Sequence, residues 1–213
     1  MSGLRNGLIV LTVFLVIGLT GVAMFNAFTQ ADEPDEIACQ PFPNNPKRVF
    51  LPVGAKAANF KLTSAAGHMV ELKKMLKDKP VLVEFFATWC PHCQHSAPIL
   101  NDLHQTFGDD IQFLAVNSGD RPNTPSTSDQ YKHDHHIQYP VLNRPSSETM
   151  DHYCVQGFPS FALINKRGKV LWAQSGSLKS GLLNDLLAEF GKIGVDVSAY
   201  QAPASPVASH AAH

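Results

Sequence analysis

The sequence has no basic cluster and almost no net charge. Lys and Arg number 17 against 18 for Asp and Glu, which gives a formal charge of -1 at pH 7. No group of Lys and Arg residues is interleaved with aromatics, so the electrostatic footprint of a nucleic-acid-binding protein is missing. We therefore expect no nucleic-acid partner. The 44% of hydrophobic residues fit one globular domain with extensions at both ends.

Cysteine is also scarce, and its spacing argues against several metal sites. The four cysteines of the chain are Cys39, Cys90, Cys93 and Cys154. A structural zinc site needs four ligands, and neither a second CxxC nor an HxxxH pair completes one. Covalent haem attachment requires histidine directly after the second cysteine of the pair, where this chain has Gln94. Binding of Cu(I) by Cys90, Cys93 and His95 stays open, since thiolates suit this soft ion.

Charge is absent from one long apolar run, Leu8–Phe25, which follows Arg5 and precedes an acidic stretch at 32–36. About 18 residues is the lower limit for crossing a bilayer, and it is long for the apolar part of a cleaved signal. The flanking charges orient the bulk of the chain outside the cytoplasm. We predict a signal anchor or signal peptide over 1–30, either retained on the periplasmic face of the cytoplasmic membrane or cleaved near residues 29–31 for release into the periplasm.

Composition divides the rest of the chain into three parts. Residues 31–52 are polar, contain Pro41, Pro43 and Pro46, and are expected to be a linker. Residues 53–192 carry the periodic apolar segments of a folded domain. Residues 193–213 are rich in Ala, Pro, Ser and His, which predicts a disordered tail.

The stretch Val81–Leu100 organises the domain. A run of β-formers leads into the motif CPHC at 90–93, and apolar residues then recur at helical spacing. The pattern predicts a buried strand that delivers the cysteines to a helix over 91–107, with Cys90 as N-cap and Pro91 in the first helical position. A helix N-terminus offers free N–H donors and about half a positive charge, which favour a thiolate. Cys90 is therefore the candidate nucleophile.

The other apolar segments predict an α/β domain that contains a βαβ crossover. Gly108 is expected to end the helix that follows the CPHC motif. The remaining expected elements are a hairpin of 58–62 with 69–72, a helical turn at 72–77, strands at 81–87, 111–116 and 139–142, helices at 129–137 and 146–155, a hairpin of 161–165 with 170–173, and a helix at 178–190.

Two separated motifs stand out, WCPHC at 89–93 and GFP at 157–159, the second before a hairpin that turns at Gly168. Over residues 53–192 this arrangement resembles the thioredoxin superfamily, and best its membrane-anchored TlpA/ResA branch. The resemblance implies a thioredoxin fold, an α/β fold in which a central mixed β-sheet is flanked by helices, here with an N-terminal β-hairpin. The Pro-His pair between the cysteines is similar to that of DsbA-type disulfide oxidases.

The cysteine spacing predicts dithiol–disulfide exchange, in which one thiolate attacks and a second resolves the mixed disulfide. Cys90 is expected to attack and Cys93 to resolve. His92 is expected to stabilise the Cys90 thiolate further, and a more stable reduced form makes a more oxidising couple. The Pro91-His92 dipeptide therefore favours an oxidant of substrate thiols. No cofactor is expected, since the electrons move between sulfur atoms.

The resemblance implies roles for three more residues. Pro159 is expected to follow a cis peptide bond and to face the cysteines, presenting the preceding backbone to a substrate chain. Glu84 interrupts the apolar strand where thioredoxins carry a buried aspartate, and is expected to exchange a proton with Cys93. A glutamate at a strand edge that reaches solvent is the alternative. Trp89, directly before the motif, belongs to the same candidate site.

Cys39 and Cys154 lie outside the motif. In an oxidising compartment an even cysteine count favours pairing, and free thiols beside an active dithiol would scramble it. We hypothesise a Cys39–Cys154 disulfide that fixes the linker to the helix before Pro159, with two free or buried cysteines as the alternative. The histidines at 133, 135 and 136 are expected to be solvated, and His95 and His104 to lie on the exposed side of their helix.

The function expected is therefore that of a protein thiol-disulfide oxidoreductase. Its partners are cysteine-containing protein substrates, a redox partner that regenerates the active state, and the membrane through the N-terminal segment. One alternative is a reductant for cytochrome c or copper-site maturation, which the TlpA/ResA resemblance implies. The other is a Cu(I) metallochaperone. A peroxidase is disfavoured because it would need a lone peroxidatic cysteine instead of this pair.

Overall fold

The computed structural model describes residues 39–42, 45–118, 127–143 and 145–201. The expected signal segment at 1–30 lies outside the described residues, as does most of the expected tail. Within the described part of the chain, no helix combines the length and the apolar character needed to span a bilayer.

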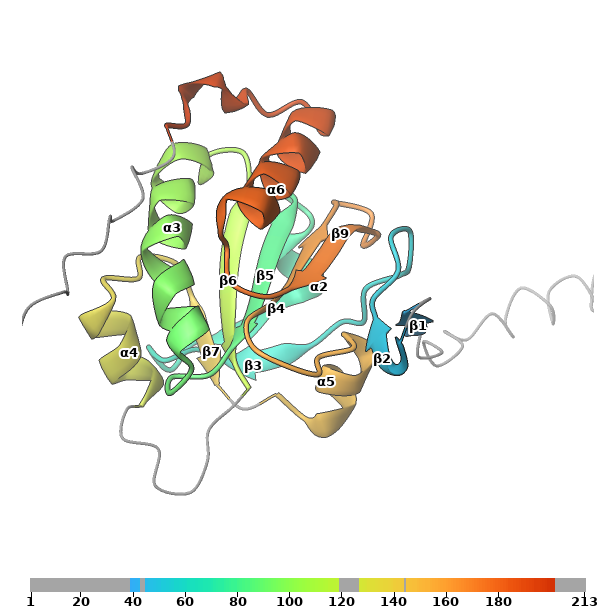
Figure 1. Cartoon of the computed structure of the whole chain (residues 1–213). Helices are drawn as coiled ribbons and strands as arrows, with labels where there is room; N and C mark the ends of the chain where they lie inside the picture. Colours follow the sequence, from blue (N-terminus) through green and yellow to red (C-terminus); the bar gives the residue numbers. More distant parts are fainter. Residues whose placement is uncertain (1–38, 43–44, 119–126, 144, 202–213) are drawn as a thin grey trace, which may run out of the picture. The chain divides into compact units, whose positions relative to one another are not determined.

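A five-stranded mixed β-sheet forms the centre of the domain, with the order β7-β6-β5-β8-β9 (Figure 1). Its strands are β5 (Val81–Phe86), β6 (Gln112–Asn117), β7 (Val141–Asn143), β8 (Ser160–Ile164) and β9 (Val170–Ser175). β6 runs parallel to β5 and β7, whereas β8 is antiparallel to β5 and β9. Every residue of β5 is buried, as expected for a central strand that is covered on both faces.

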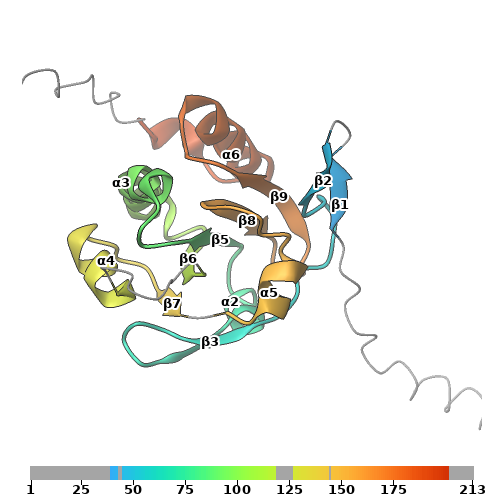
Figure 2. The same cartoon turned by 60° about the horizontal axis from the view of Figure 1, so that its bottom comes forward.

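Helices cover both faces of the sheet (Figure 2). One face packs against α3 (Pro91–Phe107), α4 (Ser128–Asp134) and α6 (Ser180–Lys192). The other face carries the short helices α2 (Leu72–Met75) and α5 (Ser147–His152). The central sheet flanked by helices agrees with the sequence-based prediction, and the predicted strands and helices of 58–190 are all present with small shifts at their ends.

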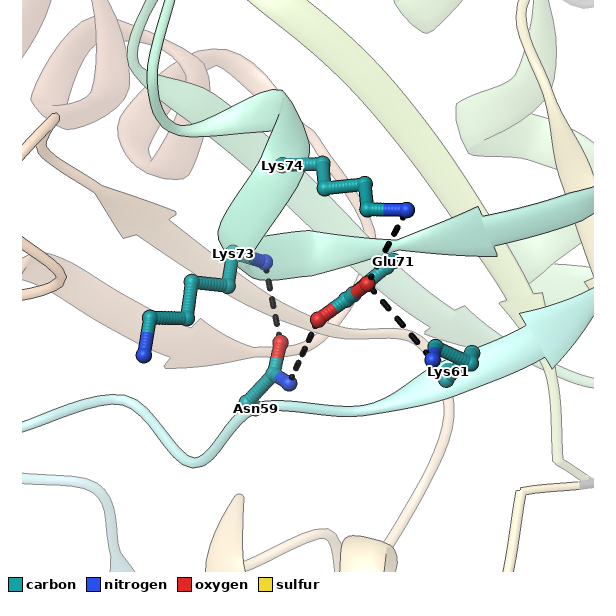
Figure 3. Close-up of polar contacts among 5 residues, drawn as sticks. All are labelled: Asn59, Lys61, Glu71, Lys73 and Lys74. Carbon is teal, nitrogen blue, oxygen red and sulfur yellow. Dashed lines mark hydrogen bonds and ion pairs between the residues drawn. The ribbon is translucent and has the colours of Figure 1, made fainter.

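The N-terminal hairpin pairs β3 (Lys61–Thr63) with β4 (Met69–Glu71), as predicted. Glu71 holds the hairpin to its surroundings, because its carboxylate accepts from Asn59 Nδ2 at 3.3 Å and lies 3.7 and 3.5 Å from the Lys61 and Lys74 ammonium groups. Figure 3 shows these contacts converging on Glu71, with the Lys73 backbone N–H donating to Asn59 Oδ1. These interactions lower the pKa of Glu71, the Asn59 hydrogen bond most of all.

The segment between Gly54 and Ala65 borders both edge strands of the sheet. At one edge, Gly54 N donates to Val170 O at 2.7 Å, and Val170 N donates to Ala55 O at 2.9 Å. At the other edge, Ala65 N donates to Val141 O at 2.8 Å, and Ser64 forms a β-bridge with Leu142. The same stretch of chain therefore pairs with the start of β9 at one edge of the sheet and with β7 at the other.

Two segments are more ordered than their composition predicts. Within the expected linker, β1 (Gln40–Phe42) and β2 (Asn45–Phe50) form an antiparallel ribbon that accommodates proline, because a two-stranded ribbon leaves half of its N–H groups unpaired. Within the expected tail, a 3-10 turn forms at Val197–Ala199, and the Tyr200 ring packs on Phe107 with centroids 5.8 Å apart. A few apolar residues anchor this end of the chain, although Ala, Pro and Ser dominate its composition.

The end of α3 differs in detail from the expectation. Gly108 is the C-cap residue and its N–H donates to His104 O, but its φ is -61°, in the right-handed helical region. The left-handed ending that glycine commonly provides is therefore not used here.

Candidate active site at the start of helix α3

The two cysteines of the CPHC motif lie where β5 passes into α3. Cys90 is the N-cap residue with extended φ and ψ of -85° and 117°, and Pro91 stands in the first turn, as predicted. The backbone N–H groups of Cys93 and Gln94 both donate to Cys90 O at 3.1 Å, which closes that turn. Both cysteines are thiols in this structure. Cys90 is 5% exposed and Cys93 is fully buried behind it.

The Cys90 sulfur faces the loop that leads into β8. Its Sγ lies 3.5 Å from the carbonyl oxygen of Phe158, within hydrogen-bonding distance for a thiol. The Phe158–Pro159 peptide bond is cis, which confirms the prediction, and Pro159 is buried. The fold thus brings together two motifs that lie far apart in the sequence.

Aromatic rings flank this contact. Trp89 is half-buried and meets the Phe158 ring edge-on, with centroids 6.2 Å apart. Gln94 Nε2 donates to the Thr88 carbonyl at 3.1 Å, which ties the turn before the motif to the first turn of α3. Trp89 therefore lies beside the cysteines, as expected, and Phe158 is a site residue that the sequence identified only through the proline after it.

Glu84 is buried on the face of β5 that looks toward α3. It is 3% exposed, so the alternative of a strand-edge glutamate that reaches solvent is wrong. Loss of water around the carboxylate raises the pKa of Glu84 to about 8. Burial raises the pKa of the Cys93 thiol well above its ordinary value, and the nearby Glu84 carboxylate raises it further. At neutral pH both groups therefore hold their protons.

The histidines near the motif differ in their surroundings. His92 and His95 are exposed, and His95 Nδ1 lies 2.9 Å from the Pro91 carbonyl of its own helix. In the part of the chain that the structure describes, no three His, Cys, Asp or Glu side chains lie together as ligands for a metal ion.

The expectation that His104 is exposed is wrong, because its ring packs between Phe113 and Tyr139 at 5.4 Å from each, and this burial lowers its pKa.

The histidines at 133, 135 and 136, at the end of α4 and just after it, match their prediction in part. His133 and His136 are exposed, whereas His135 is half-buried and its ring lies 4.3 Å from that of Tyr131. Burial lowers the pKa of His135, partly offset by the charge of Asp134.

Three side chains near the dithiol were missed in the sequence. Ser96 is fully buried in α3, where its hydroxyl donates to His92 O and accepts from Leu178 N, both at 3.0 Å. Tyr131 and Tyr139 are buried on the same face of the sheet as Glu84. A polar residue inside an apolar helical stripe is the signal for Ser96, while the two tyrosines carry no local signal because their partners come from other elements.

The second cysteine pair forms the disulfide that the sequence led us to hypothesise. Cys39 and Cys154 are bonded to each other, with their Cα atoms 5.7 Å apart. Cys154 follows α5, so the bond joins the segment before β1 to the loop that leads to Pro159.

Comparison with known proteins places this site in a family. The model of the AhpC/TSA family matches residues 53–173, which is more than half of the chain. The chain belongs to the AhpC/TSA family. The matched residues begin at the start of the folded domain and end in β9, so they include the CPHC motif, Glu84 and Pro159.

Curated relatives are similar to this AhpC/TSA protein over most of their length. The thiol-disulfide oxidoreductase ResA of Bacillus subtilis is 27% identical over 135 residues, which cover 63% of this chain and 73% of ResA. ResA of Bacillus cereus strain ATCC 10987 is 25% identical over 186 residues, or 86% of this chain and 96% of that one.

Solved structures give the same picture. The Chlorobium tepidum protein assigned as the thiol:disulfide interchange protein DsbE is 28% identical with a TM-score of 0.56, covering 66% of this chain and 99% of its own. The exposed lipoprotein thioredoxin Etrx1 of Streptococcus pneumoniae is 30% identical with a TM-score of 0.51, covering 62% and 99%. The fold is thus the thioredoxin fold. With its dithiol at the start of α3, the AhpC/TSA protein is a protein thiol-disulfide oxidoreductase.

Proposed function

We propose that the chain exchanges disulfides with cysteine-containing proteins through Cys90 as nucleophile and Cys93 as resolving thiol. The observation that carries the proposal is the position of the two sulfur atoms. Cys90 starts a helix beside the Phe158 carbonyl, while Cys93 lies fully buried one turn behind it. A substrate sulfur can approach only Cys90, and the mixed disulfide is then within reach of Cys93.

Glu84 serves as the proton acceptor and donor of Cys93 in this proposal. Cys93 must lose its proton before it attacks the mixed disulfide, and its burial makes loss to water unfavourable. Glu84 is the buried carboxylate whose charge acts on the Cys93 thiol. A carboxyl group with a pKa of about 8 exchanges protons readily near neutral pH.

We further propose that electrons flow from the dithiol to the substrate, so that the protein is a reductant. Cys90 Sγ lies 3.5 Å from the Phe158 carbonyl oxygen, which can accept a hydrogen bond from a reduced thiol but has none to donate. The side chain of His92 is exposed, where water screens its charge. The resemblance to the TlpA/ResA branch also implies a reductant, for cytochrome c or copper-site maturation.

An oxidant is the second candidate, and the Pro91-His92 dipeptide favours it. The reduction potential of the Cys90–Cys93 pair separates the two directions. A value near that of thioredoxin, about -270 mV, is expected for the reductant, whereas a value near that of DsbA, about -120 mV, would overturn this direction in favour of the oxidant.

Single cysteine variants test the roles of the two thiols. With a disulfide-bonded protein substrate, we expect Cys90→Ser to abolish exchange and Cys93→Ser to accumulate a covalent adduct at Cys90, detected by non-reducing mass spectrometry. Failure of Cys93→Ser to form that adduct would refute the proposed roles of Cys90 as nucleophile and Cys93 as resolving thiol.

We propose that the domain works outside the cytoplasm, held by or released from residues 1–30. The apolar run with its flanking charges supports this location, as does the Cys39–Cys154 disulfide, because such bonds persist in oxidising compartments. Recovery of the full chain in the cytosolic fraction of its host would contradict the proposal.

A further inference from the structure

Three buried side chains behind the dithiol have polar atoms without partners. Glu84, Tyr131 and Tyr139 are 3%, 2% and 2% exposed. Glu84 Oε1 and the hydroxyl oxygens of both tyrosines have no hydrogen-bond partner among the described residues. Buried polar groups are normally satisfied, and ordered water does this where protein groups do not.

The three side chains come from separate elements on one face of the sheet. Ala115 is the neighbour of Glu84 on β6, and Phe161 is its neighbour on β8. Because alternate residues of a strand share a face, Phe86 on β5 and Phe113 on β6 lie on the same face as Glu84 and Ala115. Ala115, with only a methyl group, is the smallest side chain next to the carboxylate on this face.

Each tyrosine ring packs against one of these two phenylalanines. Tyr131 of α4 packs against Phe86 with ring centroids 4.7 Å apart. Tyr139, which precedes β7, packs against Phe113 at 5.8 Å. Burial is the main cause that raises the pKa of each tyrosine, and the charge of Glu84 is the second. Both phenols therefore stay protonated and interact electrostatically with the Glu84 carboxylate.

His104 lies next to this group. The residue is half-buried, its ring centroid lies 5.4 Å from that of Tyr139, and its Nδ1 is buried without a hydrogen-bond partner in the described chain. His104 is therefore the member of this set of polar side chains that is partly open to solvent.

We propose that Glu84, Tyr131 and Tyr139 hold buried water that carries the Cys93 proton between Glu84 and the surface at His104. This inference rests on the proposed exchange through Cys90 and Cys93. The tyrosines are positioning residues, because their hydroxyl groups orient the water and do not themselves lose a proton.

Resolution begins when Glu84, which is neutral at pH 7, releases its proton through the water. The Glu84 carboxylate then takes the proton from the Cys93 thiol, and the Cys93 thiolate attacks the Cys90 sulfur of the mixed disulfide. The Cys90–substrate S–S bond breaks, the Cys90–Cys93 bond forms, and the substrate leaves as a thiolate that takes a proton from solvent. Glu84 ends the step protonated, as it began, so the net proton released is the one that left through the water. Reduction of the enzyme disulfide runs the same path in reverse.

The titratable groups around Glu84 come from three elements. α3 contributes Cys90, Cys93 and His104, and α4 contributes Tyr131 with His135 at its C-cap. Tyr139 precedes β7. The neighbours of Glu84 on β6 and β8 do not titrate, so Glu84 is expected to control the pH dependence of the resolving step.

Removal of single hydroxyl groups tests the relay. We compare Tyr131→Phe, Tyr139→Phe and the double variant with Tyr153→Phe, whose phenol donates to Ala58 O at 2.7 Å in the core on the other face of the sheet. The measurement is the rate at which a preformed mixed disulfide on Cys90 resolves, followed from pH 6 to pH 10 in H2O and D2O.

We expect the double variant to slow resolution roughly tenfold or more, to shift the pH midpoint of the resolving step, and to increase the D2O effect. The rate of adduct formation at Cys90 and the behaviour of Tyr153→Phe should stay unchanged. A double variant with the wild-type pH profile, or one slowed equally at every pH, overturns the relay.

Infrared spectroscopy gives a second readout that needs no turnover. The carboxyl stretch of protonated Glu84, assigned as the band lost in Glu84→Gln, should shift in Tyr131→Phe or Tyr139→Phe because its hydrogen-bonding water is disturbed. A band unmoved in both variants overturns the relay. If Cys93→Ser forms no adduct at all, the proposed exchange fails instead, and the two failures are distinguishable.

Discussion

Glu84 destabilises the fold as a buried carboxyl group, and the same group is the one that we propose for proton exchange. A carboxyl group in a fully covered strand is neutral at pH 7, because ionisation without water or a cationic partner is unfavourable. An apolar residue would suit this strand better. The polar residue lies near Cys93, whose proton we propose that it exchanges.

Glu84 predicts a definite pH dependence of stability. Its pKa is raised from 4.5 in the unfolded chain to about 8 in the folded one, so the folded state binds more protons between these values. The free energy of unfolding should therefore fall as pH rises from about 4.5 to about 8, by on the order of 4 kcal/mol for this group.

Chemical denaturation of the wild type and Glu84→Gln measures this effect. Glutamine does not titrate, so the difference in stability between the two proteins should shift in favour of the variant as pH rises from 5 to 8. Parallel stability profiles over that range would contradict the raised pKa.

For single residues, the sequence predicted those positions that depend on neighbours along the chain. The N-cap position of Cys90 and the placement of Pro91 follow from strand, motif and helix in succession, and the cis bond before Pro159 followed from the resemblance. Tyr131 and Tyr139 could not be found this way. Each is an ordinary apolar position in its own segment, and only the folded sheet brings it to Glu84.

Among the elements, α3 carries the site, and its first turn is tied to the segment before α6. The Ser96 hydroxyl bridges the His92 carbonyl and the Leu178 N–H inside the core. Without this hydroxyl the Leu178 N–H would be buried and unpaired. The link connects the turn that bears both cysteines to a part of the chain far from it in sequence.

We expect Ser96→Ala to lower the free energy of unfolding by roughly 1–3 kcal/mol, the cost of leaving a buried donor unpaired. Thr106 is the matched control, because its hydroxyl makes the same contact to a carbonyl four residues earlier, Asp102 O, on the exposed side of α3. Thr106→Ala should change stability by about 0.5 kcal/mol or less. Equal losses in urea denaturation would contradict the assignment.

The predicted elements succeeded or failed for identifiable reasons. α3 and α6 have strong helical periodicity and were located almost to the residue. The ribbon of β1 and β2 was missed because prolines and asparagines are typical of linkers, and its order comes from pairing and from a bond at Cys39 that local composition does not contain. Tyr200 was missed for the same reason, since its partner Phe107 lies on α3.

On the scale of the whole molecule, the Cys39–Cys154 disulfide closes a loop of most of the domain, with a sequence separation of 115. Cross-linking so long a loop restricts the unfolded chain. Removal of the bond should therefore lower the free energy of unfolding by roughly 3–5 kcal/mol.

The Cys90→Ala/Cys93→Ala background isolates this bond from the active dithiol. In that background we expect a reductant, or the further Cys39→Ala/Cys154→Ala substitutions, to lower the free energy of unfolding by the same amount. A variant that resists denaturant equally well with and without reductant would show that the bond contributes nothing.

The course of residues 54–65 past both border strands has a consequence for how the protein meets other chains. An open border strand invites a neighbour to pair with it, and repeated pairing leads to fibrils. Here one stretch of chain hydrogen-bonds to Val170 at the start of β9 and to Val141 of β7, so part of each border strand is already occupied. A shortened chain that starts after this stretch would leave these positions of both strands open, and we expect it to self-associate more readily.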